Sequence, residues 1–421
     1  MKLSLYGRLA MALLASVALG LGMTACGGGT IGYVWVLGQQ YNQIAGFKVD
    51  DFTGNLTSIA GSPVSSNGTN PVMMVVKQGG RFVYVINQGT GGGPGQKGTS
   101  SGISVFSVGG DGALTYLSNY ESQGFVPMWA QFDGGGTFLY VLDKYAPDAT
   151  CDSTAGSTCN GSITVFQSDP NTGRLTLVQN TQSIPPNSAA PTFFEVGQAP
   201  IMMKTTNSCL LTVNSADQSL SPYSINSSTG QLSFTGPKTQ ALNTVSASSI
   251  NGNGTYTYIT DTEPGVIVNG GPSPGRIYPF TVGTNCNLNP VTGGTVQNFA
   301  GTLNPDYSLV DISNKYLYVL NQSTTSTTVG TAFSSMSAWT INPTNGQLAP
   351  IAGAPFTTGS GPVCMVEDAS SQYIYVSNHN DGTVTGKVID PTTGNLSALS
   401  RGSTFTATGQ ATCLGFSGAV N

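Results

Sequence analysis

The chain is poor in charged side chains, and this scarcity excludes several classes of function. Lys and Arg together number 14 and Asp and Glu 19 among 421 residues, so that 8% of the chain is charged, whereas roughly 25% is usual. No cluster of basic residues occurs, and the formal net charge is −5. Without a basic patch, neither a nucleic acid nor an anionic lipid surface would be attracted. We therefore expect no nucleic-acid partner.

Metal ligands and nucleophile motifs are equally scarce. His379 is the only histidine, and no two of the seven cysteines are spaced as Cys-x-x-Cys, the spacing typical of zinc sites. Gly359-Ser360-Gly361 has no helical segment after it, so the strand-to-helix nucleophile elbow of serine hydrolases is excluded as well. We expect neither a bound metal nor a cofactor.

Helical periodicity is missing after the N-terminus, and a repeat takes its place. Each unit contains an apolar strand that ends in Asn or Asp, then a second strand and a turn that closes on Gly-x-Leu. A fixed period of this size indicates an array of one supersecondary unit, and units of short strands form the blades of a β-propeller. The seven closing phrases, with leucines 48 to 61 residues apart, are Gly54-Asn55-Leu56, Gly112-Ala113-Leu114, Gly173-Arg174-Leu175, Gly230-Gln231-Leu232, Cys286-Asn287-Leu288, Gly346-Gln347-Leu348 and Gly394-Asn395-Leu396.

The two ends of the repeat region predict how the ring closes. Residues 31–59 contain the second, third and fourth strands of a blade that lacks a first strand, and residues 411–416 contain a first strand with nothing after it. Joining the two gives an all-β, seven-bladed propeller of four-stranded antiparallel blades and removes exposed sheet edges. A six-bladed ring with ragged ends is the alternative. We expect a single propeller domain that is monomeric.

The N-terminal segment predicts export. Lys2 and Arg8 precede an apolar run of about 14 residues, which is too short for a permanent membrane span and typical of a secretory signal. Met23-Thr24-Ala25-Cys26 resembles a bacterial lipobox, in which the Cys is diacylated; an ordinary signal cleaved near Ala25 is the alternative. More than one acyl chain anchors a protein firmly. We expect a signal peptide over 1–25, a lipidated Cys26 with a Gly-rich tether over 26–30, one propeller domain over 31–421, and a location at the periplasmic or outer-surface face of the cell envelope.

Six cysteines remain once Cys26 is set aside, in keeping with export into oxidising surroundings. Six cysteines allow fifteen pairings. The positions of the cysteines within the repeat reduce the number of plausible pairings. Cys286 stands where the other six repeats have Gly, a position that needs positive φ, and a bridge to Cys209 in the neighbouring unit would explain it. The predicted pairs are Cys151–Cys159 within one insertion, Cys209–Cys286, and Cys364–Cys413 between consecutive first strands.

One rim of the ring carries most of the inserted sequence. The connections from second to third strands and from fourth strands to the next first strands share this rim, with insertions at 88–102, 144–161, 183–199, 262–276 and 322–335. Such a rim is typical of a recognition face, while its Gly and Ser content also suits plain loops. Six polar residues that end second strands could ring a pocket or merely begin turns, and they are Asn87, Asp143, Asn214, Asp261, Asn321 and Asn378.

Three strand ends carry a family resemblance. The segments Tyr84-Val85-Ile86-Asn87, Tyr318-Val319-Leu320-Asn321 and Tyr375-Val376-Ser377-Asn378 resemble the seven-bladed propeller lactonases, the family of cycloisomerase-type 6-phosphogluconolactonases, and the likeness extends over nearly the whole mature chain. The resemblance implies hydrolysis of a sugar lactone by water without an essential redox cofactor, and an Arg and a His after such a strand. His379 follows Asn378 here, but the Arg is missing at every copy, which argues against a phosphorylated substrate.

Two functions follow from these observations. The first is a non-catalytic binding or scaffold module, tethered outside the cytoplasmic membrane, whose loop-rich rim holds a protein or glycan partner. The second is a divergent lactonase acting on a neutral sugar lactone, with His379 and Glu367 or Asp368 as the acid–base pair that ester hydrolysis requires. A surface histidine in a turn and solvated carboxylates at a strand end are the alternative interpretation of these three residues.

Overall fold

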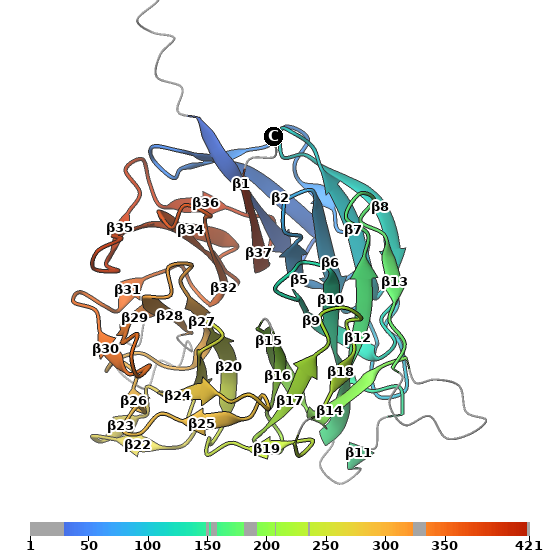
Figure 1. Cartoon of the computed structure of the whole chain (residues 1–421). Helices are drawn as coiled ribbons and strands as arrows, with labels where there is room; N and C mark the ends of the chain where they lie inside the picture. The colour runs from blue at the N-terminus through green and yellow to red at the C-terminus, as the bar shows by residue number, and fades with distance from the viewer. Residues whose placement is uncertain are drawn as a thin grey trace, which may run out of the picture.

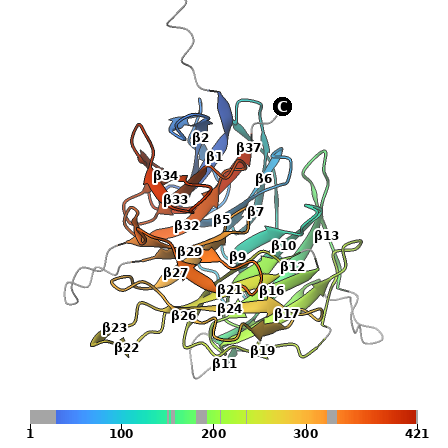
Figure 2. The same cartoon turned by 60° about the vertical axis from the view of Figure 1, so that its left-hand side comes forward.

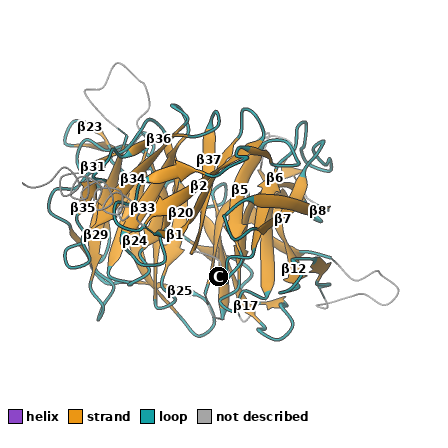
Figure 3. Ribbon diagram, turned by 90° about the horizontal axis from the view of Figure 1, so that it is seen from above, coloured by secondary structure: helices purple, strands orange, loops and turns teal. Residues whose placement is uncertain are grey.

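All regular structure among the described residues is β-strand. The computed structural model describes residues 29–148, 151–152, 158–180, 192–206, 208–234, 236–322 and 334–418. Seven antiparallel sheets, each with four principal strands, stand around a central axis (Figures 1 and 3). The predicted all-β, seven-bladed propeller is therefore confirmed. Within those ranges, no helix is long and apolar enough to cross a membrane, and the predicted signal peptide and Cys26 lie outside them.

The blades are numbered from the one that contains the first described strand. In order from blade 1 to blade 7, the inner strands are β37 (Ala411–Gly418), β5 (Pro71–Val76), β9 (Phe125–Phe132), β15 (Pro200–Thr205), β20 (Ala247–Gly252), β27 (Pro305–Val310) and β32 (Pro362–Glu367). The second strands are β1 (Thr30–Gly38), β6 (Phe82–Asn87), β10 (Phe138–Tyr145), β16 (Cys209–Asn214), β21 (Tyr256–Asp261), β28 (Tyr316–Asn321) and β33 (Tyr373–Asn378).

The third strands have seven residues or more, whereas the outer strands are short in every blade except blade 2. The third strands are β2 (Gln43–Asp50), β7 (Gly102–Val108), β12 (Thr158–Ser168), β17 (Ser219–Ile225), β24 (Arg276–Val282), β29 (Ser335–Ile341) and β34 (Thr383–Ile389). The outer strands are β3 (Leu56–Ser58), β8 (Leu114–Tyr120), β13 (Leu175–Leu177), β18 (Leu232–Ser233), β25 (Leu288–Pro290), β30 (Leu348–Pro350) and β35 (Leu396–Ala398). Six further pieces also pair with third strands, namely β4 (Val64–Ser65), β14 (Phe194–Gln198), β19 (Gln240–Ala241), β26 (Val296–Gln297), β31 (Phe356–Thr357) and β36 (Thr404–Thr406), while β11 (Cys151–Asp152), β22 (Ile267–Val268) and β23 (Gly271–Pro272) lie in insertions.

Strand direction gives the ring two unlike faces. In blade 7, Pro362 at the start of β32 is paired with Asn378 at the end of β33, whereas Glu367 at the other end of β32 is paired with Ile374. The face with the starts of the inner strands also carries the long connections from second to third strands, and we call it the loop face. The opposite face carries the turns from first to second and from third to fourth strands, and we call it the turn face.

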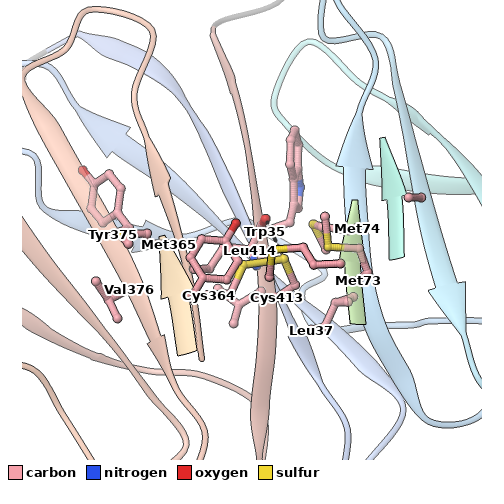
Figure 4. Packing of buried hydrophobic residues seen from close by; sticks show 14 of the residues in the cluster. Trp35, Leu37, Met73, Met74, Cys364, Met365, Tyr375, Val376, Cys413 and Leu414 are labelled. Atoms are coloured by element: carbon pink, nitrogen blue, oxygen red, sulfur yellow. Dashed lines mark hydrogen bonds between the residues drawn. A yellow bond between two sulfur atoms is a disulfide. The ribbon is translucent and has the colours of Figure 1, made fainter. Parts of the chain in front are cut away.

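Strands from both ends of the chain complete blade 1. β1 pairs antiparallel with β37, with Val34 opposite Phe416, so the inner strand of this blade comes from the C-terminal part of the chain (Figure 2). A disulfide between Cys364 on β32 and Cys413 on β37, whose Cα atoms are 5.1 Å apart, joins blade 7 to blade 1 beside Leu414 (Figure 4). The meeting point of the two chain ends is thus held by a strand ladder and a covalent bond.

Hydrogen bonds between neighbouring blades explain the glycine of the Gly-x-Leu phrase. At six of the seven junctions an aromatic side chain of a second strand donates to the carbonyl oxygen of that glycine in the next blade. Because a buried carbonyl without a partner is costly, each bond fixes the spacing of two blades. The donors and acceptors are Trp35 to Gly112 (3.0 Å), Tyr84 to Gly173 (3.0 Å), Tyr140 to Gly230 (3.3 Å), Tyr258 to Gly346 (3.1 Å), Tyr318 to Gly394 (2.9 Å) and Tyr375 to Gly54 (2.6 Å).

A second contact at the same glycines excludes any side chain. Gly346 has a φ of +72°, and a Cβ atom there would overlap the ring of Tyr256, the first residue of β21. The equivalent rings at the other junctions occupy the same place, as Phe82 does beside Gly173. Glycine is therefore required twice over, for its left-handed backbone and for the space that the aromatic ring takes.

The seventh junction, between blades 4 and 5, replaces this arrangement by a disulfide. Cys209 occupies the position of the aromatic ring, Cys286 (φ +65°) occupies the position of the glycine, and Leu211 stands where a hydrogen-bonding tyrosine occurs in other blades. Cys209 and Cys286 are bonded, with Cα atoms 5.6 Å apart. The covalent bond thus takes the place of both the ring contact and the hydrogen bond.

Candidate functional site

The central channel opens on the loop face into a cavity of about 360 Å³, which we call the loop-face chamber. It lies where the inner strands begin and the second strands end. Its polar and aromatic lining comes from blades 1, 3, 6 and 7 and consists of Gln39, Trp129, Tyr307, Gln322, His379 and Thr412. No Lys, Arg, Asp or Glu is among the residues that line it.

Two aromatic side chains separate this chamber from the other half of the channel. Trp129 on β9 and Tyr307 on β27 have ring centroids 6.0 Å apart, and both also line a cavity of about 330 Å³ on the turn face. The indole Nε1 of Trp129 is buried without a hydrogen-bond partner among the described residues. A buried donor without an acceptor is unfavourable, and the protein tolerates this cost at the centre of the channel.

His379 follows the last residue of β33 and lines the loop-face chamber. Its Nδ1 atom lies 3.0 Å from the carbonyl oxygen of Ala411. Because a carbonyl can only accept, this bond places the ring proton on Nδ1 and leaves Nε2 as the unprotonated nitrogen of the neutral imidazole. The backbone N–H of His379 also donates to the carbonyl of Gly361 at 2.7 Å. The histidine is thus held in one tautomer, with Nε2 available to a ligand.

A carboxyl group stands behind the chamber wall. The amide Nε2 of Gln322 donates to Asp306 Oδ2 at 2.9 Å, and burial raises the pKa of Asp306 to about 6. Asp306 follows the proline of its inner strand, at a position where the other six blades have Val72, Met128, Ile201, Ser248, Val363 and Thr412. The carboxyl orients Gln322, whose amide lines the chamber.

The predicted acid–base pair is not brought together. His379 follows the end of β33 on the loop face, whereas Glu367 ends β32 on the turn face. At about 3.3 Å per residue, the length of the strand separates them by roughly 15 Å. Residues of one blade share a site only when they lie at the same end of its antiparallel strands, and these do not.

The two predicted carboxylates have separate environments. Glu367 is buried, its Oε2 accepts the N–H of Ile312 at 2.8 Å, and burial raises its pKa to about 7. Asp368 accepts the backbone N–H groups of Gln372 (2.8 Å) and Tyr373 (2.6 Å), so it holds the turn into β33. Asp311 holds the equivalent turn of blade 6 in the same way. Asp368 therefore has a structural role.

The six strand-ending polar residues do not ring a pocket, because their side chains are fully buried inside their own blades. Asn378 shows the common arrangement, in which its Nδ2 donates to the hydroxyls of Thr383 (3.0 Å) and Thr385 (2.9 Å) on β34. Two acidic members of the set act as acceptors instead. Asp143 accepts from two hydroxyls and one backbone N–H, and Asp261 accepts from backbone N–H groups. The full set is Asn87, Asp143, Asn214, Asp261, Asn321 and Asn378.

Two of the three predicted disulfides are present, at Cys209–Cys286 and Cys364–Cys413. In the third pair, Cys151 on β11 stands opposite Cys159 on β12, and Cys159 is disulfide-bonded. The side chain of Cys151 lies outside the described residues, so that pairing stays a prediction. Disulfides are compatible with an extracytoplasmic location.

Comparisons with known proteins agree with the fold. No protein-family model and no curated protein matches the sequence. Solved structures with a similar fold include a candidate 6-phosphogluconolactonase of Bacteroides fragilis, with 16% identity, coverage of 92% of this chain and 98% of that one, and a TM-score of 0.66. The periplasmic gluconolactonase of Pseudomonas aeruginosa has 15% identity, coverage of 92% and 99%, and a TM-score of 0.64. This chain therefore has the fold of lactonase-like propellers, and identities this low do not extend to activity.

Proposed function

We propose that this protein is an extracytoplasmic binding module that holds a small, neutral, hydroxyl-rich ring, such as a sugar or a sugar lactone, in the loop-face chamber. The observation that carries the proposal is the lining of that chamber. Trp129 and Tyr307 offer flat apolar surfaces for the ring, while Gln39, Gln322 and His379 offer hydrogen bonds, the combination typical of small-molecule pockets. No cation lines the chamber to pair with a phosphate.

The proposal also includes the location of the protein. The disulfides and the fold shared with a periplasmic gluconolactonase support an extracytoplasmic location. We include in the proposal a lipid anchor at Cys26, which would place the propeller at the surface of a membrane. The long connections of the loop face surround the chamber and would extend it toward a glycan or protein that carries the ring.

Ring binding is tested by the fluorescence of tryptophan, since Trp129 lines the chamber. We expect 1,5-anhydro-D-glucitol, a neutral ring without an ester, to change the emission in a saturable way. His379→Ala should weaken binding by about tenfold, the loss expected for one hydrogen bond. Asn380→Ala, which changes an exposed neighbour, is the matched control and should leave the affinity unchanged. Equal affinity in all three proteins, or no saturable change in the parent, contradicts the proposal.

Lactone hydrolysis is the second candidate, and the tautomer of His379 favours it. An unprotonated Nε2 in the chamber can take a proton from a water molecule that attacks an ester carbonyl. The side-chain amides of Gln39 and Gln322, which line the same chamber, are donors for the developing oxyanion. This arrangement needs no arginine, so it is suited to an uncharged lactone.

Turnover of D-glucono-1,5-lactone, corrected for its spontaneous hydrolysis, tests the second candidate. His379→Ala should reduce the catalysed rate by about a hundredfold or more, as for loss of a general base. Gln322→Met keeps the length of the side chain and removes the amide donor, so a smaller loss is expected, mainly in kcat. If the parent hydrolyses no lactone faster than buffer does but still binds the anhydroglucitol, the protein is the binding module alone.

A further inference from the structure

The turn-face half of the channel is lined by one residue from each inner strand. The fifth position of each strand, counted from the proline or alanine that starts its ladder, forms this ring. Going round the propeller from blade 3, the ring is polar over three consecutive blades and apolar over the next four. Its members are Gln131, Lys204 and Asn251, followed by Leu309, Val366, Gly415 and Val75. The cavity that they line, of about 330 Å³, we call the turn-face chamber.

Lys204 is the centre of the polar arc. It is partly buried, and none of the ion pairs between described residues involves it. Burial alone lowers its pKa to about 8, with no carboxylate to offset it. The lysine in blade 2, Lys77, differs because its ammonium group donates to the carbonyl of Gly136 and lies over the ring of Phe132. Lys204 therefore carries a positive charge without an ion-pair partner at a partly buried position, which is unfavourable in the empty protein.

Of the two polar neighbours of Lys204, Gln131 leaves donors toward the same space. Gln131 Oε1 accepts the N–H of Thr205 at 3.1 Å, which commits the oxygen and leaves the amide N–H groups to a ligand. Asn251 uses its Nδ2 on the carbonyl of Ser308 at 2.8 Å. Opposite them, Leu309 and Val366 expose only hydrocarbon. The chamber thus has a polar wall with one cation, and a mainly apolar wall at whose edge Glu367 lies.

We propose that the turn-face chamber binds a small organic carboxylate with an unbranched hydrocarbon body, whose carboxylate pairs with Lys204 and whose hydrocarbon packs on the apolar arc. The site is separate from the loop-face chamber, because Trp129 and Tyr307 lie between them. It is also independent of the function proposed above, since no residue of the polar arc lines the loop-face chamber.

Three titratable groups line this chamber: Lys204, Glu367 and Tyr307. Burial raises the pKa of Glu367 to about 7, so below that pH its carboxyl is protonated and does not repel an anion. Burial also raises the pKa of Tyr307, which therefore stays neutral. Lys204 is charged below about pH 8. Binding of a carboxylate should accordingly be strongest between about pH 6 and 7 and should weaken as the pH rises to 9.

Hexanoate is the probe for this proposal, with binding measured by calorimetry at pH 6.5. We expect hexanoate to bind the parent protein at least tenfold more tightly than hexan-1-ol, which has the same chain without the charge. Lys204→Met keeps the length of the side chain and removes the charge, and should weaken hexanoate binding tenfold or more, in line with loss of a charged hydrogen bond. Lys238→Met, at an exposed lysine, is the matched control and should change nothing.

Several results would overturn the proposal. They are equal hexanoate affinity in the parent and Lys204→Met proteins, absence of hexanoate binding to the parent, and an affinity that does not fall between pH 6.5 and 9. Displacement of hexanoate by 1,5-anhydro-D-glucitol would assign the fatty acid to the loop-face chamber and reject the turn-face site. The melting temperature of Lys204→Met serves as the folding check, and it should be no lower than that of the parent because an unpaired buried charge is removed.

Discussion

Replacing both Cys209 and Cys286 by serine is expected to lower the free energy of unfolding by about 4 kcal/mol. The bond closes a segment of 77 residues that spans the junction of blades 4 and 5, so its loss gives the unfolded chain much more freedom. This junction has neither the aromatic-to-glycine hydrogen bond nor the ring contact of the other six. Its interface would then depend on apolar packing and on the remaining hydrogen bonds, such as the one from the backbone N–H of Leu288 to Gln240 Oε1 at 2.8 Å.

The other six junctions show which substitutions should restore the stability lost in the double serine variant. Cys209→Phe together with Cys286→Gly recreates the contact that Phe82 makes with Gly173, and the glycine removes the strain of a side chain at positive φ. We expect this double variant to recover at least half of the lost stability and to be unaffected by reductants at this junction. Addition of Leu211→Tyr should contribute about a further 1 kcal/mol through the missing hydrogen bond.

Guanidinium unfolding at equilibrium distinguishes the contributions at this junction. Cys209→Ala with Cys286→Gly is the matched control, because it relaxes the backbone without supplying a ring. The order of stability expected is parent, then the Phe–Gly protein, then the Ala–Gly protein, then the double serine protein. If the Phe–Gly protein is no more stable than the Ala–Gly protein, the aromatic ring has no stabilising role at the other junctions either.

The fold could be predicted from the sequence because the turn and strand patterns that determine it are local and recur in every repeat. Each Gly-x-Leu phrase combines a turn that needs a left-handed residue with a leucine that faces the core, so register follows from short-range chemistry. The exception at Cys286 was informative for the same reason, since a cysteine at a glycine position needs a compensating contact. The aromatic donors at the junctions were visible only as apolar strand residues, because their partners lie 76 to 90 residues away or, for Tyr375, in the N-terminal part of the chain.

The site was harder to predict, since it is assembled across the channel. His379 was singled out as the only imidazole, and it does line a chamber. Its partners there are Trp129 and Tyr307, which come from blades 3 and 6 and have the sequence appearance of ordinary core aromatics. Alignment of the inner strands would have found Asp306 and Lys204, because each is the single charged residue at its position in the ring. The pairing of His379 with Glu367 failed because antiparallel strands place their ends on opposite faces.

The carboxyl of Asp143 is expected to make stability depend on pH, and Asp143→Asn should remove this dependence. Asp143 is fully buried, and burial raises its pKa to about 7, despite hydrogen bonds to Oδ2 from Ser122 (2.7 Å) and Thr164 (2.9 Å). The folded-state pKa thus lies above the unfolded value near 4. The contribution of this group to stability is then complete below about pH 4 and is lost as the pH rises through 7.

The difference in the free energy of unfolding between the parent and Asp143→Asn reports on Asp143 alone, because Glu367 and Asp306 contribute equally to both proteins. We expect Asp143→Asn to be more stable than the parent by about 4 kcal/mol at pH 8 and by little at pH 4. The four blades with asparagine here show why an amide fits, because its Nδ2 would donate to the hydroxyl of Ser162, which has no partner now. Asn378→Asp is the converse control and should destabilise blade 7 more at pH 8 than at pH 4. Thermal melts across this range provide the measurement, and a gain that is the same at both ends would mean that the Asp143 carboxyl does not titrate between them.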